Sequence, residues 1–413
     1  MRRAWRWLLG GLLALAAIAG VAAWGAWSLL RAAPGEWSHP LQWGPWRIEA
    51  SVPTLLRMAT HPLVLRRLEG RTLATPFGPV HWEAGDAANR WRMRCAPCRV
   101  RLPELGRDPV VLAQVRIDAH RLAQDQWQGE LMLGDEAHAV RGRWKAVFDA
   151  RGAELRVQLD DTPLDHAYRL FADAIPEVGR ARIEGRLRLS AQLRLPQREL
   201  AVQPQIEGFR VEGLGTEALL DARPACGPVP AQGFGVWLPR AVIAAEDQRF
   251  FEHPGYDLRE MNAAWSLNQR QRDATRGGST LSQQLAKLLY AGDGRDHVRK
   301  LRELLYAVEL DRTLGKARVL QLYLAIAPWG EGRCGAAAAS RHYLHKRVDK
   351  LTPTEAAWLA SLLRAPDREW GRFEQSGEVD VERVGWVIAH LRPMNAERRQ
   401  ALVDALPQWS PRP

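Results

Sequence analysis

The sequence predicts an α+β protein of several domains: an N-terminal transmembrane helix, a β-rich domain and a mainly helical domain. Three observations predict this order. The chain begins with a long run free of charge, alternates apolar and polar residues from about 64 to 225, and from Pro239 to about Pro366 repeats apolar residues at three and four positions. Alternation is the period of half-buried strands, and recurrence at three and four is that of amphipathic helices. The 413 residues leave room for two ordinary domains beyond a membrane helix.

The first 31 residues are predicted to be a cytoplasmic tip and a membrane anchor. Trp7 to Leu30 are 24 residues without a charge, enough for a helix to cross the hydrocarbon core. Arg2, Arg3 and Arg6 precede the run, so the positive-inside rule places the N-terminus in the cytoplasm and the rest outside. A cleaved signal peptide is the alternative, but the run exceeds the usual stretch of about 7 to 15 residues and no clean cleavage site follows.

Residues 32–225 are predicted to form the β-rich domain. Stretches such as 110–117 and 181–195 alternate apolar and polar residues, and a helical piece at about 164–174 interrupts them. The stretch from Ile175 through the Gly185 strand to Val211 resembles the membrane-anchored AsmA-type β-proteins of the bacterial envelope. No residue of this domain looks catalytic. Pro and Gly residues at 223–230 mark the boundary to a mainly helical domain, residues 226–413.

The four cysteines fit a compartment that permits disulfides. Cys95 and Cys98 have the spacing of a redox or half-zinc motif, but no second CxxC accompanies them, which favours a local structural disulfide. Cys226 and Cys334 remain a candidate second pair that the sequence does not establish.

Charge is spread along the chain and argues against nucleic acid as a partner. The chain has 58 Lys and Arg residues against 47 Asp and Glu residues, a formal net charge of +11, and the two signs are interspersed. Only six of the basic residues are lysines. Since arginine is the usual cation here, we expect the function of a lysine such as Lys287 to require lysine specifically.

Glu246 is the first candidate for chemistry. We expect a helix to begin at Pro239 and to continue through Phe251, which spaces Val242, Glu246 and Phe250 along one apolar stripe. Apolar surroundings raise the pKa of a carboxylate toward that of a working general base. The alternative is a structural glutamate that is buried in a salt bridge with an arginine.

A glycine-rich loop opens the next candidate helix. Gly277 and Gly278 precede Ser279 and Thr280, and Thr280 with Gln283 has the spacing of a capping box. Such a helix start offers backbone N–H groups to an anion, although ordinary capping also explains the pattern. Lys287, on the same face as Gln283, favours a phosphate.

A third cluster follows on one helix face. Arg295, Arg299 and Glu303 are spaced four residues apart, so the two cations should hold Glu303 ionised, unlike Glu246. A solvated ladder of salt bridges is the alternative.

In order and spacing, these stretches resemble the five motifs of the family 51 glycosyltransferases, the peptidoglycan glycosyltransferases that polymerise lipid II. The resemblance covers residues 232–366, and implies a lysozyme-like, mainly helical transferase domain. Its motifs are Glu246-Asp247-x-x-Phe250-x-x-His253-x-Gly255, Gly277-Gly278-Ser279-Thr280-x-x-Gln283-Gln284-x-x-Lys287, Arg299-Lys300-x-x-Glu303, Lys316-x-x-Val319-Leu320-x-x-Tyr323-Leu324, and Gly335 with Tyr343-x-x-Lys346.

The resemblance implies roles for these residues. Glu246 would deprotonate the sugar 4-hydroxyl of the acceptor lipid II, which attacks C1 of the growing donor strand. Glu303 is the second catalytic glutamate, and Lys287 and Arg295 would hold the donor diphosphate. The full set of expected substrate-binding residues is Asp247, Phe250, His253, Ser279, Thr280, Gln283, Gln284, Lys287, Arg295, Arg299 and Lys300.

The sequence departs from the family at a few positions. Leu288 and Ala325 stand where the family usually has Asn, and Leu344-His345 replaces the usual Phe-Gly. None of these is the base or a diphosphate ligand, so activity is still expected. Ser-x-x-Lys and Lys-Thr-Gly are absent, which predicts no transpeptidase activity. No cluster has the spacing of a protein metal site, but a divalent cation, Mg or Mn, that bridges the substrate diphosphate stays open.

The sequence therefore predicts a single-pass enzyme of the bacterial inner membrane, with its bulk in the periplasm. Its expected partners are lipid II, the growing glycan strand, the membrane and other cell-wall synthesis proteins. A lysozyme-like glycan hydrolase with Glu246 as the acid is one alternative, but Lys287 and Arg295 would then meet no diphosphate. An envelope scaffold that carries a degenerate transferase domain is another, and the retained glutamates argue against it.

Overall fold

The computed structural model describes residues 28, 30–43, 46–85, 89–100, 109–270, 277–292 and 297–411. The expected anchor helix, Trp7 to Leu30, lies almost entirely outside them. Within these ranges, no helix is both long and apolar enough to cross a membrane.

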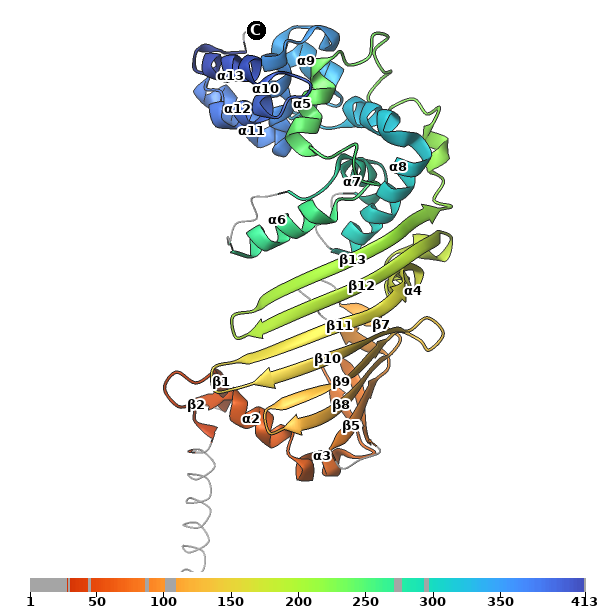
Figure 1. Cartoon of the computed structure of the whole chain (residues 1–413), viewed down its shortest axis with the longest axis vertical. Coiled ribbons are helices and arrows are strands. Elements are labelled where there is room, and N and C mark those ends of the chain that lie inside the picture. Colours follow the sequence, from red (N-terminus) through yellow and green to blue (C-terminus); the bar gives the residue numbers. More distant parts are fainter. Residues whose placement is uncertain are drawn as a thin grey trace, which may run out of the picture. The chain divides into compact units, whose positions relative to one another are not determined.

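The chain forms two compact units that interleave along the sequence. The first comprises Met1–Val100, Val111–Thr162 and Leu187–Gln205, and the second comprises Arg101–Val110, Pro163–Arg186 and Ile206–Pro413. Each is described by itself below (Figure 1).

A large sheet dominates the first unit. Its nine strands have the order β13-β12-β11-β10-β9-β8-β5-β4-β3, and neighbouring strands from β3 to β11 pair antiparallel. The bounds are β3 (Thr72–Thr75), β4 (Gly78–Ala84), β5 (Arg90–Cys95), β8 (Val115–Ala123), β9 (Gln126–Leu133), β10 (Val140–Phe148), β11 (Ala153–Pro163), β12 (Arg182–Leu195) and β13 (Glu199–Glu212). The last two strands contribute residues to both units.

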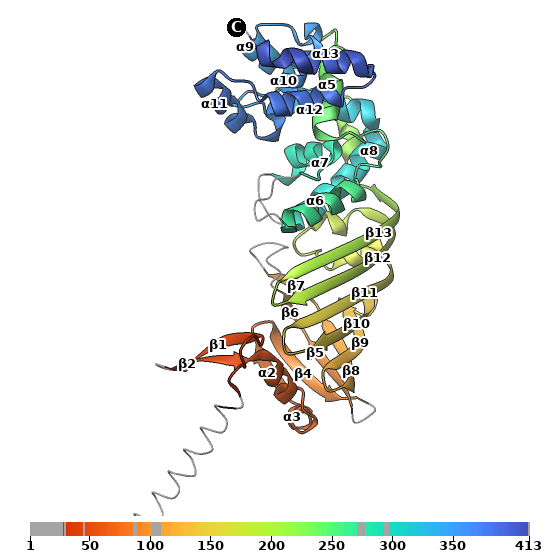
Figure 2. The same cartoon turned by 60° about the vertical axis from the view of Figure 1, so that its left-hand side comes forward.

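The alternation in the sequence sets the two faces of this sheet. Along β10, Arg141, Arg143 and Lys145 are exposed, whereas Val140 and Phe148 are buried. Two short helices, α2 (Val52–Ala59) and α3 (Pro62–Leu68), pack against the apolar face of the sheet (Figure 2). The core there consists of Leu65, Trp91, Ala119, Trp127 and Phe148.

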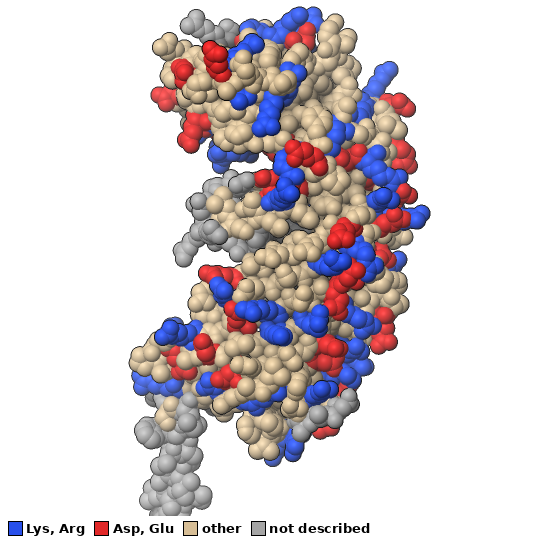
Figure 3. All heavy atoms as spheres, viewed as in Figure 1, with Lys and Arg blue, Asp and Glu red and all other residues tan. Residues whose placement is uncertain are grey.

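Smaller elements complete this part of the chain. β1 (Ser38–Trp43) pairs antiparallel with β2 (Trp46–Ser51), and β6 (Cys98–Val100) pairs with β7 (Val110–Leu112). Cys95 and Cys98 form the expected local disulfide. Lys and Arg side chains are interspersed with Asp and Glu over the visible surface, as the sequence predicts (Figure 3).

The second unit is mainly helical, as the period of three and four predicts. Its helices are α4 (Leu164–Arg169), α5 (Trp237–Glu246), α6 (Leu258–Arg270), α7 (Leu281–Ala286), α8 (His297–Ile326), α9 (Ala336–Leu344), α10 (Pro353–Ser361), α11 (Pro366–Ser376), α12 (Val381–Ala389) and α13 (Ala396–Ala405). A π-helix, η3 (Lys287–Ala291), follows α7, and short 3₁₀ helices are η1 (Pro176–Gly179), η2 (Thr216–Leu219), η4 (Val348–Lys350), η5 (Leu362–Arg364) and η6 (Leu406–Gln408).

Three details of this unit differ from or extend the sequence prediction. The helical piece expected at 164–174 is the shorter α4, and a turn follows it. α8 is kinked at Gly315, whose φ of 73° is a left-handed value that glycine adopts without strain. Cys226 and Cys334 form the second disulfide, which the sequence left open.

Candidate active site

The helix that carries Glu246 is shorter than predicted. α5 ends at Glu246, because Asp247 leaves the helical conformation with φ −159° and ψ 73°. The expectation of a helix through Phe251 is therefore wrong, and Phe250 does not continue the stripe of Val242 and Glu246. Asp247 instead accepts a hydrogen bond from the backbone N–H of Leu281, and this tertiary contact ends the helix.

Glu246 is enclosed by side chains from other helices. Its side chain is 14% exposed, and Gln284 donates a hydrogen bond from Nε2 to Glu246 Oε2 at 3.0 Å. The hydroxyl of Tyr323 donates to Oε1 of Gln284 at 2.8 Å, which fixes the orientation of that amide. A guanidinium nitrogen of Arg383 lies 3.7 Å from Glu246 Oε1.

The pKa of Glu246 is raised above its usual value. Burial is the main cause and the negative charge of Asp247 adds to it, while Gln284, Arg383 and Arg364 act in the opposite direction. This direction is the one expected for a general base near neutral pH.

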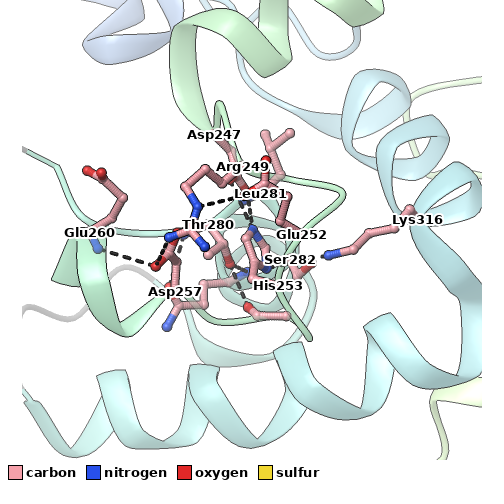
Figure 4. A network of polar contacts seen from close by, with 12 residues as sticks. Asp247, Arg249, Glu252, His253, Asp257, Glu260, Thr280, Leu281, Ser282 and Lys316 are labelled. Atoms are coloured by element: carbon pink, nitrogen blue, oxygen red, sulfur yellow. Dashed lines mark hydrogen bonds and ion pairs between the residues drawn. The ribbon is translucent and has the colours of Figure 1, made fainter. Parts of the chain in front are cut away.

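Three of the residues expected to bind substrate are buried, and Figure 4 shows two of them, Asp247 and His253, close to Leu281 at the start of α7. Phe250 is fully buried, and Asp247 and His253 are 8% and 6% exposed. His253 Nε2 lies 3.0 Å from both carboxylate oxygens of Asp247. These side chains hold the loop after α5 against the start of α7.

The same network continues to α8. Lys316 Nζ lies 3.4 Å from His253 Nδ1 and 2.9 Å from an oxygen of Asp311, and it also stands over the ring of Phe250. Ser282 donates a hydrogen bond to Asp311 at 2.8 Å. Because a lysine ammonium can only donate, Nδ1 of His253 is the acceptor and Nε2 carries the proton toward Asp247.

The start of α7 is capped by the protein itself. Thr280 and Gln283 form the predicted capping box, in which the side chain of each accepts from the backbone of the other. Asp247 accepts a hydrogen bond from the N–H of Leu281, and the Thr280 hydroxyl donates one to the carbonyl of Gly255 at 2.6 Å. Ordinary capping therefore explains this helix start, and the predicted use of its N–H groups for an anion gains no support.

Cations lie near both ends of α7. Lys300 contacts Ser279 Oγ, and it lies 3.0 Å from Glu303 Oε2. Arg299 pairs with the other oxygen of Glu303, whose side chain is 2% exposed. Lys287 is close enough for its charge to act on Lys300. Arg295, the remaining expected diphosphate ligand, lies outside the described residues.

The pKa of Lys300 reflects its burial and, next, the neighbouring cations. Burial, followed by the positive charges of Arg299 and Lys287, lowers the pKa of Lys300 to about 8. The cations Lys287, Arg299 and Lys300 together favour an anionic ligand.

The sequence interpretation gave no role at Glu246 to two arginines, Arg383 and Arg364. Arg383 on α12 donates to the carbonyl of Ala245 at 3.1 Å, although 138 residues separate the two, and Arg364 also acts on the Glu246 carboxylate. No periodicity or spacing signals such a contact. Tyr323 was in a quoted motif, but its role as the donor to Gln284 required the structure.

Comparison with known proteins identifies this part of the chain. Residues 223–391 match the family model described as transglycosylase. Over 129 residues the chain is 46% identical to a biosynthetic peptidoglycan transglycosylase of Nitrosomonas eutropha, covering 31% of this chain and 53% of the relative. Relatives of the same name from Klebsiella oxytoca and Escherichia coli are 42% and 41% identical over 161 residues, covering 39% of this chain and 66% of each relative.

The chain thus spans between about half and two thirds of the length of these relatives. The matched region contains Glu246, Lys287 and Glu303, and it extends beyond the predicted motifs to include Arg383. Residues 223–391 are therefore a transglycosylase domain, of the family 51 glycosyltransferases that its motifs resemble.

Proposed function

We propose that this protein is a peptidoglycan glycosyltransferase that polymerises lipid II into glycan strands, without transpeptidation. The observation that carries the proposal is the juxtaposition of a buried carboxylate with a raised pKa and a cluster of cations. Gln284 contacts Glu246, and Lys287 follows Gln284 by one helical turn. The proposed base therefore contacts α7, and an anion-binding group lies at the C-terminal end of that helix.

Glu246 acts as the general base. Its carboxylate takes the proton of the acceptor sugar 4-hydroxyl as that oxygen forms a bond to C1 of the donor strand. Gln284, oriented by Tyr323, holds the carboxylate in place. The C1–O bond to the diphosphate breaks in the same step, so attack from the opposite face inverts the configuration at C1.

The cations stabilise the leaving group. The bond electrons pass to the polyprenyl diphosphate, whose negative charge grows as it departs. Lys287, Lys300 and Arg299 stabilise that charge electrostatically. We assign Arg295 to the same role from its motif position. Glu303 keeps Arg299 and Lys300 in place through its two ion pairs. A divalent cation, if one takes part, is brought by the diphosphate.

The other sequence-predicted residues act on the architecture of the site. Asp247, His253 and Phe250 secure the loop after α5, while Thr280 and Gln283 cap α7. Ser279 contacts Lys300 and belongs to the cationic side. We propose that these residues shape the site, and that Glu246 and the cations contact the substrate.

The proposal includes a location. Lipid II is a membrane lipid, so an enzyme with the predicted anchor in the inner membrane meets its substrate at the periplasmic surface. The growing strand and the membrane are then partners, along with other cell-wall synthesis proteins. A reporter fused after Pro413 should be active in the periplasm, and activity of a cytoplasmic reporter at that position would contradict this topology.

The decisive experiment incubates the detergent-solubilised full-length protein with labelled lipid II. We expect glycan polymer, resolved by gel electrophoresis, and no labelling of the protein by a fluorescent β-lactam. A parallel incubation with preformed glycan strands tests the hydrolase alternative, which predicts shortened strands there and no polymer from lipid II. Failure of both reactions would favour the degenerate-transferase alternative.

A further inference from the structure

One side of α8 is covered by two segments that precede the transferase domain in sequence. These segments, residues 163–186 and 206–222, belong to the same compact unit as α8, and together we call them the brace. Tyr168 donates to the carbonyl of Leu301 at 3.3 Å, and the N–H of Leu214 donates to Glu309 at 2.9 Å. The brace therefore contacts α8 along several turns.

The central contact of the brace is a buried carboxylate. Glu177 in η1 is 4% exposed, and its Oε1 accepts hydrogen bonds from Arg302 Nε at 2.8 Å and from the hydroxyl of Tyr306 at 3.1 Å. Arg180 donates to the same hydroxyl at 3.2 Å. Burial opposes the charge of Glu177, but the hydrogen bonds from Arg302 and Tyr306 outweigh it and leave the pKa of Glu177 below its usual value.

A buried anion of this kind is costly unless it has a structural purpose. Its partners suggest the purpose. Arg302 and Tyr306 flank Glu303 on α8, and Glu303 holds two of the cations of the proposed site. The hydroxyl of Tyr306 receives contacts from two residues of η1 and its flank, so the position of its ring is defined by the brace.

Tyr306 in turn contacts the π-helix η3 through a stacked ring. The ring of Tyr290 is stacked on that of Tyr306, with centroids 4.0 Å apart and an angle of 5° between the planes. Tyr290 belongs to η3, whose first residue is Lys287. π-helices are rare and are frequently found at functional sites.

We propose that Glu177 is a positioning residue of the transferase site, which fixes Tyr306 and, through the stacked Tyr290, holds the π-helix that begins at Lys287. This inference rests on the proposed role of Lys287 as a ligand of the donor diphosphate. The brace is then part of the catalytic unit, although its sequence lies before the transglycosylase match.

The test separates the hydrogen bond from the stacking, in the full-length protein. Glu177→Gln and Tyr306→Phe weaken the hydrogen-bonded contact but leave both rings, whereas Tyr290→Leu removes the stack and Tyr290→Phe retains it. Glu212→Gln is the matched control, since Glu212 also joins the brace to α8, through Arg312, but its side chain is half exposed and has no contact with η3 among the described interactions.

Two quantities are measured: the rate of lipid II polymerisation and the inhibition constant of inorganic pyrophosphate as a probe of the diphosphate site. Because a small displacement of a charged group weakens its action strongly, we expect Glu177→Gln and Tyr290→Leu to raise the inhibition constant by about tenfold and to lower the rate by a similar factor. Tyr290→Phe and Glu212→Gln should match the wild type, and Tyr306→Phe should lie between.

Each outcome of these measurements supports or overturns either the role of Glu177 or the proposed function. If the wild type polymerises lipid II but Glu177→Gln and Tyr290→Leu keep the wild-type inhibition constant, Glu177 has only a structural role and the inference is wrong. A loss of thermal stability without a change in the inhibition constant has the same meaning. If Glu177→Gln does not fold, the comparison of Tyr290→Leu with Tyr290→Phe decides alone. A wild type that makes no polymer overturns the proposed function itself.

Discussion

Glu246 and Glu303 are the same residue type in opposite electrostatic surroundings. Glu246 is held by a neutral amide, with the nearest guanidinium nitrogen 3.7 Å away, and burial raises its pKa. Glu303 is more deeply buried but contacts two cations directly, Arg299 and Lys300. A carboxylate that binds a proton readily suits proton transfer, and one that is paired with cations suits the support of charge. The neighbours therefore decide the role of each glutamate.

The largest expected effect is that of Glu246→Gln. Glutamine keeps the shape and the contact with Gln284 but removes the base, so the polymerisation rate should fall by about 10² to 10⁴ while lipid II still binds. Glu252→Gln, at an exposed ion pair with Arg249, is the matched control. A variant that polymerises at a near wild-type rate would show that Glu246 is not the base.

The same substitution should not lower stability. Because the folded-state pKa of Glu246 is raised, its ionised form disfavours folding. This cost grows as pH rises above the unfolded-state pKa and is complete above the folded-state pKa. Glu246→Gln removes it, so at pH 7 the melting temperature should equal or exceed that of the wild type. A marked fall would indicate a structural role.

Lys287→Ala should have the next largest effect. Loss of one preorganised cation at the departing diphosphate should lower the rate by about 10² to 10³, with weaker inhibition by pyrophosphate. Lys350→Ala, at an exposed lysine of the same unit, serves as the control. An unchanged rate would assign Lys287 to the ordinary surface of the helix.

Glu303→Gln should give a smaller loss of rate than Glu246→Gln, and one that depends on the concentration of divalent ions. It should also destabilise the fold, in contrast to Glu246→Gln, because it leaves Arg299 and Lys300 without their shared anion. We expect an unfolding free energy lower by roughly 1–3 kcal/mol, measured by urea denaturation. If both glutamine variants change stability in the same direction, the contrast between the two sites is not electrostatic.

The smallest effect is visible only in the pH profile. Activity should fall on the acidic side as Glu246 is protonated, and on the alkaline side as Lys300 loses its proton near its lowered pKa of about 8. Lys300→Arg keeps its charge at all these values, so it should extend activity to higher pH with little change at pH 7. An alkaline limb at the same pH in both proteins would exclude Lys300 as its source.

Local rules accounted for much of this protein. The capping box of Thr280 and Gln283 joins residues within one helical turn, so the sequence alone predicts it, and the structure confirms it. The alternation along β10 and the disulfide of Cys95 with Cys98 are local in the same sense. The motifs that contain Lys287 and Glu303 indicate the family because each spaces its residues within one short stretch of the chain.

Departures from the family pattern show the limit of such rules. His345 stands where the family usually has glycine, and in the structure it takes the left-handed conformation at the C-terminal end of α9, with φ 50°. Glycine favours this conformation, and here a histidine adopts it. The sequence identified the departure but not its conformational meaning.

The sequence by itself determined the class of each part, the order of the motifs and the identity of the candidate base and cations. Only the tertiary structure decided where α5 ends, since the N–H of Leu281 donates a hydrogen bond to Asp247. It also decided which groups surround Glu246, since Arg383 comes from a helix far along the chain. It likewise decided that Arg302 donates a hydrogen bond to Glu177, although 125 residues of sequence separate the two. Periodicity and capping arise from neighbours within a few residues, whereas these contacts depend on how distant segments pack, for which the spacing of residues along the chain carries no signal.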